Sequence, residues 1–384
     1  LLGGYNANQV NIFATVPGVG ENFIDAFNAI KASSSYNSPL MNRLFTGNAA
    51  NNAGTATFRT AASASIANGS VATAAQTVSQ RLCLASDVTS GFCSAANLQL
   101  ISQTVANPFL LQPYPQFSGG FNVFDSSDYS NYRALEVIVR RRMVSGLSYQ
   151  ASYTWSLSKD NRSWDPSLST VSTGSVQSAS STPFDLRNRS LNYAWSDFDR
   201  RHVLQGTFVY NLPFGKGERW LANNRALDYL VGGWQVSGSM LAASGRPFTV
   251  YSGINTLSNV VQSTANCSGC SRHLGKLVIE SGKNFWFDAA GRALFSQPAA
   301  GSIGNTGRNY FVAPVYFQPD LSIMKKFRIT ERVSFDLRAD IRNLTNHPSF
   351  DNPTAVFTSS IFGRINDSVT NTARRIQFVG KLYF

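Results

Sequence analysis

The sequence is poor in charged residues and has no long apolar run. Only 14% of its 384 residues are Asp, Glu, Lys or Arg, whereas a soluble globular domain carries roughly 25%. It contains no run of about 18 apolar residues, so it cannot form an ordinary transmembrane helix. Low charge without a helical span, together with 12% aromatic residues, is typical of chains that cross a membrane with alternating apolar and polar residues.

Patterns of enzyme chemistry are also missing. The chain has no Gly-x-Ser-x-Gly nucleophile elbow and no Walker loop. Its three histidines, His202, His273 and His347, lie far apart in the sequence, which argues against a zinc protease or a Ser/His/Asp hydrolase. We therefore expect no enzyme activity, catalytic residue, cofactor or metal centre. The segment Asp197-Phe-Asp199-Arg-Arg-His202 could serve acid–base chemistry, but we favour ion pairs where an external loop enters a strand.

Four cysteines form two close pairs in loop-like sequence, Cys83 with Cys93 and Cys267 with Cys270. Close pairs in an oxidising compartment usually form local disulfides, and we expect this for both. The alternative for Cys267-Ser-Gly-Cys270, which is followed by His273, is a metal site. A single Cys-x-x-Cys without a second pair is a weak signal for zinc.

The net charge is +12. A basic balance can indicate nucleic acid binding, but the Lys and Arg residues are scattered and no basic helix, finger or aromatic platform accompanies them. We expect no nucleic acid partner. An anionic lipid surface or a charged barrel lumen explains the excess equally well.

Two-residue alternation is clearest in residues 147–158. Apolar and aromatic side chains occupy the odd positions there, and uncharged polar side chains occupy the even ones. This pattern indicates a strand with lipid on one side and water on the other. Similar strands are predicted at 134–143, 202–212, 233–243, 320–329, 333–343 and 374–384, which makes seven antiparallel strands within residues 132–384.

The connections between these strands run short, long, medium, long, short, long. In outer-membrane barrels the periplasmic turns are short and the external loops are long. The pattern therefore predicts the turns near Val144, Lys216 and Thr330, and the C-terminus, on the periplasmic side. The loops at 159–200, 251–317 and 346–371 are predicted outside, and the Ser/Thr-rich stretch 167–182 is predicted to be mobile.

The predicted inward faces carry charges of alternating sign. We expect these to line a watery lumen or to contact a plug: Glu136, Arg140, Asp320, Lys326, Asp336, Arg338, Asp340 and Arg342. In the last hairpin, paired residue numbers that sum to 662 give a three-residue turn at 330–332. Lys326 then faces Asp336, Asp320 faces Arg342, and Phe327 meets Phe335 on the other face.

The last residues form a strand that ends on an aromatic side chain. Gly380, Leu382 and Phe384 share its apolar face with Ile376 and Phe378. This ending resembles the C-terminal signal of outer-membrane β-barrels, which the barrel-assembly machinery reads. The alternative is the last strand of a soluble sheet.

The first third of the chain is less patterned. Residues 1–13 are predicted to include the end of a strand, at 8–13, and 14–131 to form a long external loop with one short amphipathic helix at 21–32. Residues 48–80, rich in Ala, Thr, Ser and Asn, show no clear element. The chain begins Leu-Leu-Gly-Gly without Met, and we interpret it as part of something longer.

Several segments together resemble the C-terminal barrel half of TonB-dependent outer-membrane receptors, specifically the Oar-like group that often carries a carboxypeptidase-regulatory-like domain. Any one of them is weak, but their order and number are fairly specific. They are residues 11–13, 21–27, 131–135, 146–148, 152–156, 196–202, 212–215, 232–238, 244–248, 304–309 and 343–348.

The resemblance implies a 22-stranded barrel closed by a separate plug domain and energised through the TonB complex. We therefore expect an all-β fold: an antiparallel transmembrane β-barrel in the bacterial outer membrane, with residues 1–384 supplying about its last eight strands and long external loops. The plug domain is absent from this chain, so contact with TonB would need a missing N-terminal part. Outer-membrane lipid, lipopolysaccharide and an unknown solute are the other expected partners.

The expected function is TonB-dependent uptake of a large or scarce solute. One alternative is a surface or adhesion barrel, or a porin, without energised transport. Another is a soluble all-β binding module, which the outward aromatic residues disfavour.

Overall fold

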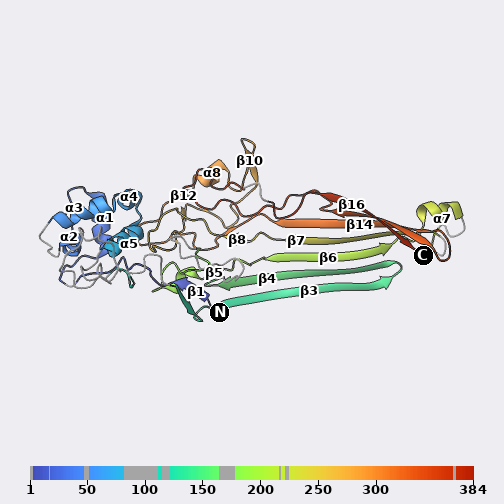
Figure 1. The fold of residues 1–384 in the computed structure, drawn as a ribbon, viewed down its shortest axis with the longest axis horizontal. Helices are drawn as coiled ribbons and strands as arrows, with labels where there is room; N and C mark the ends of the chain where they lie inside the picture. The colour runs from blue at the N-terminus through green and yellow to red at the C-terminus, as the bar shows by residue number, and fades with distance from the viewer. Residues whose placement is uncertain are drawn as a thin grey trace.

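The largest element of the computed structural model is an antiparallel sheet (Figure 1). The structure describes residues 3–16, 18–46, 52–81, 111–114, 122–163, 178–215, 218–220, 225–365 and 369–384. The strands of the sheet follow the order β16-β15-β14-β7-β6-β4-β3, and the short β5 pairs with β4. Their bounds are β3 Ser130–Val144, β4 Leu147–Asp160, β5 Ala194–Trp195, β6 His202–Asn211, β7 Trp234–Ala243, β14 Tyr316–Arg328, β15 Ser334–Arg342 and β16 Arg375–Tyr383.

These seven long strands confirm the seven predicted from alternation. β3 and β4 are joined by a two-residue turn in which both Ser145 (φ 50°) and Gly146 (φ 78°) have positive φ. Such turns match the twist of the flanking strands. A side chain at position 146 would also lie 2.6 Å from the Asn211 carbonyl oxygen, so both space and conformation call for glycine there.

The sheet is open at both edges. Among the described residues, β3 and β16 each have a long neighbouring strand on one side only. The described residues therefore form an open antiparallel sheet, and they do not by themselves close the barrel of which the chain was expected to supply about eight strands. An open edge exposes a row of backbone N–H and C=O groups, which hydrocarbon cannot satisfy.

The connections alternate as predicted. Those joining β4 to β6, β7 to β14 and β15 to β16 are long and gather at one end of the sheet, here called the loop end (Figure 1). The turns β3–β4, β6–β7 and β14–β15 and the C-terminus lie at the opposite end, the turn end, together with helix α7 Arg225–Val231 (Figure 1).

Five helices lie beyond the loop end: α1 Phe23–Ala32, α2 Pro39–Thr46, α3 Ala53–Ala61, α4 Ser63–Asn68 and α5 Val71–Arg81 (Figure 1). None of the described helices is long and apolar enough to cross a membrane. The prediction of a helix at 21–32 is confirmed by α1, but the expectation of a single helix was wrong. The Ala-rich residues 53–81 form helices because Ala has the highest helix propensity, and Ala72, Ala74 and Ala75 are fully buried.

Two apolar cores hold the loop end together. The first joins the helices to distant loops, because Phe23, Phe27 and Phe58 share one cluster with Phe184 and Val261. The second is a group of phenylalanines from the β7–β14 and β15–β16 connections. The Phe287 ring lies 5.5–6.1 Å from four others, Phe248, Phe295, Phe311 and Phe362. The described parts of the long connections are therefore packed around these two cores, whereas residues 164–177, most of the stretch predicted to be mobile, lie outside the described residues.

The remaining strands are short. β1 Gly3–Asn6 pairs with β2 Asn122–Asp125, and residues 8–13, where a strand end was expected, lie outside any strand. The β7–β14 connection contains three further pairs: β8 Pro247–Phe248 with β13 Phe311–Val312, β9 Asn266–Cys267 with β12 Phe295–Ser296, and β10 Val278–Glu280 with β11 Lys283–Phe285. It also holds helix α8 Ala289–Arg292. A 3-10 helix, Arg189–Asn192, precedes β5.

Candidate functional site

The ladders gather most of the apolar residues of the seven long strands on one face of the sheet, here called the apolar face. One row of directly opposed residues crosses six strands from β4 to β16: Tyr149, Phe208, Gly238, Leu321, Ile341 and Ile376. Many large side chains of the apolar face are exposed. Phe378 of β16 is 74% exposed and Leu135 of β3 is 56% exposed. An exposed apolar surface of this extent is typical of contact with lipid or another protein.

The opposite face, called the polar face, carries every charge that the sequence assigned to a lumen. One row of opposed residues runs Arg140, Gln150, Thr207, Ser239 and Asp320. Glu136, opposite Thr154, lies on the same face. The other five members follow on β14 and β15, because alternate residues of a strand share a face.

The hairpin of β14 and β15 has the predicted register. Lys326 lies opposite Asp336 and Phe327 opposite Phe335, so paired numbers sum to 662 and the prediction is confirmed. On its other side Asp336 lies opposite Lys381 of β16. The carboxylate therefore sits between two lysines. Further along β15, Arg338 forms an ion pair with Asp340 (2.9 Å).

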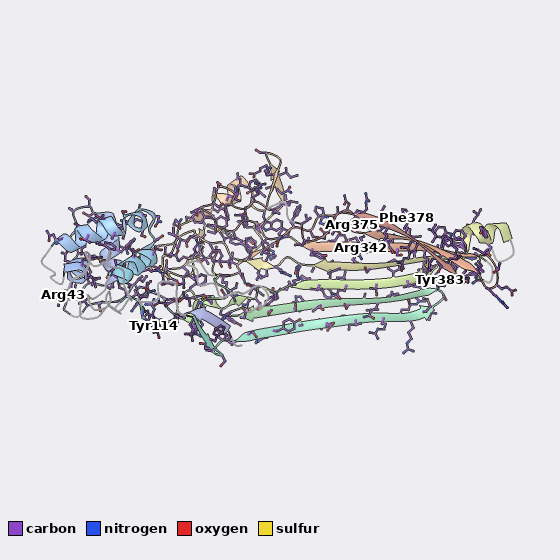
Figure 2. The ribbon with its side chains drawn as sticks, in the orientation of Figure 1. Arg43, Tyr114, Arg342, Arg375, Phe378 and Tyr383 are labelled. Atoms are coloured by element: carbon purple, nitrogen blue, oxygen red, sulfur yellow. A yellow bond between two sulfur atoms is a disulfide. The ribbon has the colours of Figure 1, made fainter. Side chains whose placement is uncertain are left out.

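The expected pair of Asp320 and Arg342 is absent from this ladder, which ends at Leu321 and Ile341. The reason is a turn of the backbone: Asn343 has φ 50°, and its N–H donates to the Asp320 carboxylate (2.8 Å). Arg342 instead lies opposite Arg375 of β16, and Figure 2 shows the two arginines side by side. Like charges across a ladder oppose its formation, so the pair of arginines destabilises the pairing of β15 with β16 at this position.

At the loop end a fully buried arginine ties three segments together. The Arg308 guanidinium forms an ion pair with Asp160 at the end of β4 and donates to the Asn192 carbonyl (2.9 Å). It also lies 3.5 Å from Asp197, which accepts a hydrogen bond from Asn309 (2.6 Å). These bonds fix the β4–β6 and β7–β14 connections to each other over the sheet.

The second carboxylate of the 197–202 segment is also used to anchor loops. Asp199 accepts a hydrogen bond from the Ser158 backbone N–H (2.8 Å) and lies 4.0 Å from Arg272. Arg272 stacks on Trp195 at 3.8 Å from the ring centroid. Burial lowers the pKa of Arg272 to about 10, against the opposing effect of Asp199. These contacts agree with the ion-pair interpretation of the segment.

A two-faced sheet with all long connections at one end is the pattern of a membrane barrel wall. The sequence model of the family described as an outer membrane beta barrel domain matches residues 42–377. The chain belongs to the outer membrane beta barrel domain family. It accordingly resides in the bacterial outer membrane. The curated proteins and the solved structures gave no match.

In this outer membrane beta barrel domain, Cys267 of β9 forms a disulfide with Cys270, and their Cα atoms are 5.6 Å apart. Cys83 and Cys93 lie outside the described residues. His273, the third member of the alternative metal site, is exposed. Within the described ranges no group of three or more His, Cys, Asp or Glu side chains could hold a metal.

The C-terminal residues of the barrel domain lie on the edge strand β16. Leu382 is opposite Phe335, and Gly380 is opposite Leu337. A side chain at position 380 would lie 3.2 Å from the Phe335 ring, so glycine makes room for that ring. Phe384 follows the strand and is 98% exposed. Its role in assembly stays a prediction.

Sequence reasoning missed the central role of Arg308. The segment Gly304-Asn-Thr-Gly-Arg-Asn309 was part of the family resemblance, but nothing local indicated that its arginine would be buried. A signal was present in the low charge content, because an arginine in a loop with so few acidic neighbours needs distant carboxylates as partners.

Proposed function

We propose that this barrel domain is part of a TonB-dependent receptor that imports a large or scarce solute. The observation that carries the proposal is the continuous two-faced sheet: seven strands gather most of their apolar residues on one face, and the opposite face carries most of the charged residues of β3, β14, β15 and β16. In this proposal the apolar face contacts lipid and the polar face lines the lumen.

The loop end then faces outside and the turn end faces the periplasm, because periplasmic turns are the short ones. Strands outside the described residues would cover β3 and β16, since hydrocarbon does not tolerate an open edge. We propose a 22-stranded barrel of this kind, which is wide enough to need a plug. Lipid and lipopolysaccharide surround it, and the barrel-assembly machinery inserts it.

The packed loop end supports a receptor over an open pore. The two phenylalanine-rich cores and the Arg308 contacts hold the long connections in one arrangement above the sheet. Binding residues are commonly placed on loops that a rigid scaffold positions. A porin needs a clear entrance, whereas a receptor needs an ordered external surface on which to capture a scarce solute.

The test uses the complete gene in its own bacterium. A deletion strain should lose accumulation of one or more solutes from a panel of large nutrients at low concentration. Accumulation should return with the complete gene and fail to return when the TonB complex is inactivated. Uptake that is independent of TonB would contradict the proposal and favour a porin. Unchanged uptake with lost surface attachment would favour an adhesion barrel.

A further inference from the structure

The apolar face carries a lysine at its turn end. Lys325 of β14 lies between Trp234 of β7 and Leu337 of β15, in a row of otherwise apolar residues. A lysine facing lipid opposes insertion, most strongly at the bilayer midplane and least near the interface. Lys325 is only 4% exposed, so the chain itself covers the ammonium group.

The β6–β7 connection and α7 provide this cover. The Lys325 ammonium donates to the Gly232 carbonyl. A side chain at Gly232 would lie 2.3 Å from the Asp228 carboxylate, and one at Gly215 would lie 2.7 Å from the Gly232 Cα atom. The helix is fixed on the sheet by two aromatic contacts: the Trp234 indole N–H donates to the Leu230 carbonyl (3.0 Å), and the Tyr229 ring lies 5.7 Å from that of Phe327.

The cover leaves a cavity of about 110 Å³. Its charged lining consists of three cations and two carboxylates: Lys325, Lys326, Arg328, Glu218 and Asp228. An ammonium group has three donors, and in the described part of the chain Gly232 is the single acceptor bonded to that of Lys325. A buried ammonium with unused donors is costly, so a further acceptor in the cavity would stabilise it.

Apolar side chains lie exposed around this cavity. Trp220 is 51% exposed, Tyr229 57%, Leu230 68% and Ile329 56%. Aromatic and aliphatic residues at this level are typical of the boundary between hydrocarbon and headgroups. Water alone would satisfy the ammonium but would leave this apolar surface uncovered. A molecule with an anionic head and apolar chains matches both features.

We propose that this turn-end pocket binds the headgroup of a glycerophospholipid with a primary amine, as in phosphatidylethanolamine. Its phosphodiester accepts hydrogen bonds from Lys325 and Arg328, its ammonium lies toward Glu218 and Asp228, and its acyl chains cover the exposed apolar residues. The assignment rests on the apolar face contacting lipid, as in the proposed function. It does not depend on solute uptake or on TonB.

The test is native mass spectrometry of the full-length protein extracted from its membrane. The wild type should retain phosphatidylethanolamine and, after delipidation, rebind it in preference to phosphatidylcholine, phosphatidylglycerol and lipid A. Lys325→Met should lower retention at least tenfold. The matched control is Lys381→Met, at the same end of the sheet but on the polar face, and it should retain the lipid as the wild type does.

Folding is checked by gel mobility of unheated samples. Should Lys325→Met fail to fold, Arg328→Gln replaces it, because Arg328 is exposed at the strand end, and the same loss is expected. Wild-type retention in the folded variants would overturn the proposal. Equal binding of phosphatidylglycerol would overturn the headgroup assignment, and preference for lipid A would overturn the choice of a glycerophospholipid. Lipid retention by a wild-type protein that supports no TonB-dependent uptake would count against the proposed function alone.

Discussion

Lys326 lies directly across from Asp336 in the ladder between β14 and β15, and Phe327 lies across from Phe335 on the opposite face. A slip of one residue would turn the charges of one strand toward the apolar face. The backbone N–H of Ile329 donates to the Val333 carbonyl (3.0 Å), which closes the hairpin around residues 330–332. Opposite charges on one face and the stacked Phe327 and Phe335 rings on the other, with centroids 6.2 Å apart, favour this register of the hairpin.

The first prediction tests this register with engineered disulfides. Lys326→Cys combined with Asp336→Cys should cross-link under mild oxidation, because directly opposed residues have Cβ atoms about 4.5–5.5 Å apart. Lys326→Cys combined with Ser334→Cys, a diagonal pair on the same face, is the control and should stay reduced. Peptide mass spectrometry identifies the linked residues. Cross-linking of the control pair at an equal yield would refute the register.

The second prediction concerns the two faces of β4. Ala151 lies on the apolar face opposite Val139 and Gly206, and Ser152 lies on the polar face opposite Ile138 and Gln205. Ala151→Arg should reduce the free energy of unfolding in lipid vesicles by roughly 2–4 kcal/mol if the position is near the midplane, whereas Ser152→Arg should be tolerated. Denaturant titrations of both variants measure the difference. Equal destabilisation would reject the facing.

The third prediction concerns assembly. Phe384 directly follows β16 and is almost fully exposed. Deleting it should reduce insertion of the full-length protein into the outer membrane far more than deleting one residue within 167–182. Immunoblots of outer-membrane fractions give the measurement. Normal insertion of the truncated protein would show that the barrel-assembly machinery does not recognise the terminal aromatic residue.

The fourth prediction concerns the loop end. Arg308→Met leaves the buried Asp160 carboxylate without its ion-pair partner, and breaking a buried pair typically destabilises by about 3–5 kcal/mol. Hydrogen exchange should accelerate in residues 189–199 while the long strands stay protected. Arg187→Gln is the control, because its exposed pair with Asp185 should contribute about 0–1 kcal/mol. Unchanged exchange in Arg308→Met would contradict the anchoring role.

The fifth prediction is a pH dependence in the helical part. The Tyr36 hydroxyl donates to Glu21 (2.6 Å), and this hydrogen bond, with burial, raises the pKa of Tyr36 to about 12. An unfolded tyrosine titrates near about 10, so the bond stabilises the fold fully below pH 10 and is lost as pH rises from 10 to 12.

Absorbance of the phenolate, taken as wild type minus Tyr36→Phe, should therefore have its midpoint near pH 12. In Glu21→Gln, measured against the matching double variant, the midpoint should move toward about 10. A wild-type midpoint already near 10 would disprove the coupling between the two side chains.

Short-range patterns in the sequence were enough to predict the long strands, their faces and the Lys326–Asp336 register. The reason is that side chains of a strand alternate between its two faces, so neighbouring residues are enough to show which side chains share a face. The long and short connections were equally visible, because they depend only on where the alternation stops. The apolar face of 147–157 could be predicted without knowing any partner strand.

Tertiary structure decided what depends on distant partners. Arg308 contacts Asp160 and Asn192, far away along the chain, and Asp320 lost its predicted partner to a backbone turn at Asn343. The helices of 53–81 bury small Ala faces, which carry little periodic signal. Lys325 lies among apolar residues of β14, and its burial depends on the β6–β7 connection, whose Gly232 carbonyl accepts its hydrogen bond. In each case the conformation depends on packing and burial against distant segments. A short stretch of neighbouring residues does not show which distant segments these are.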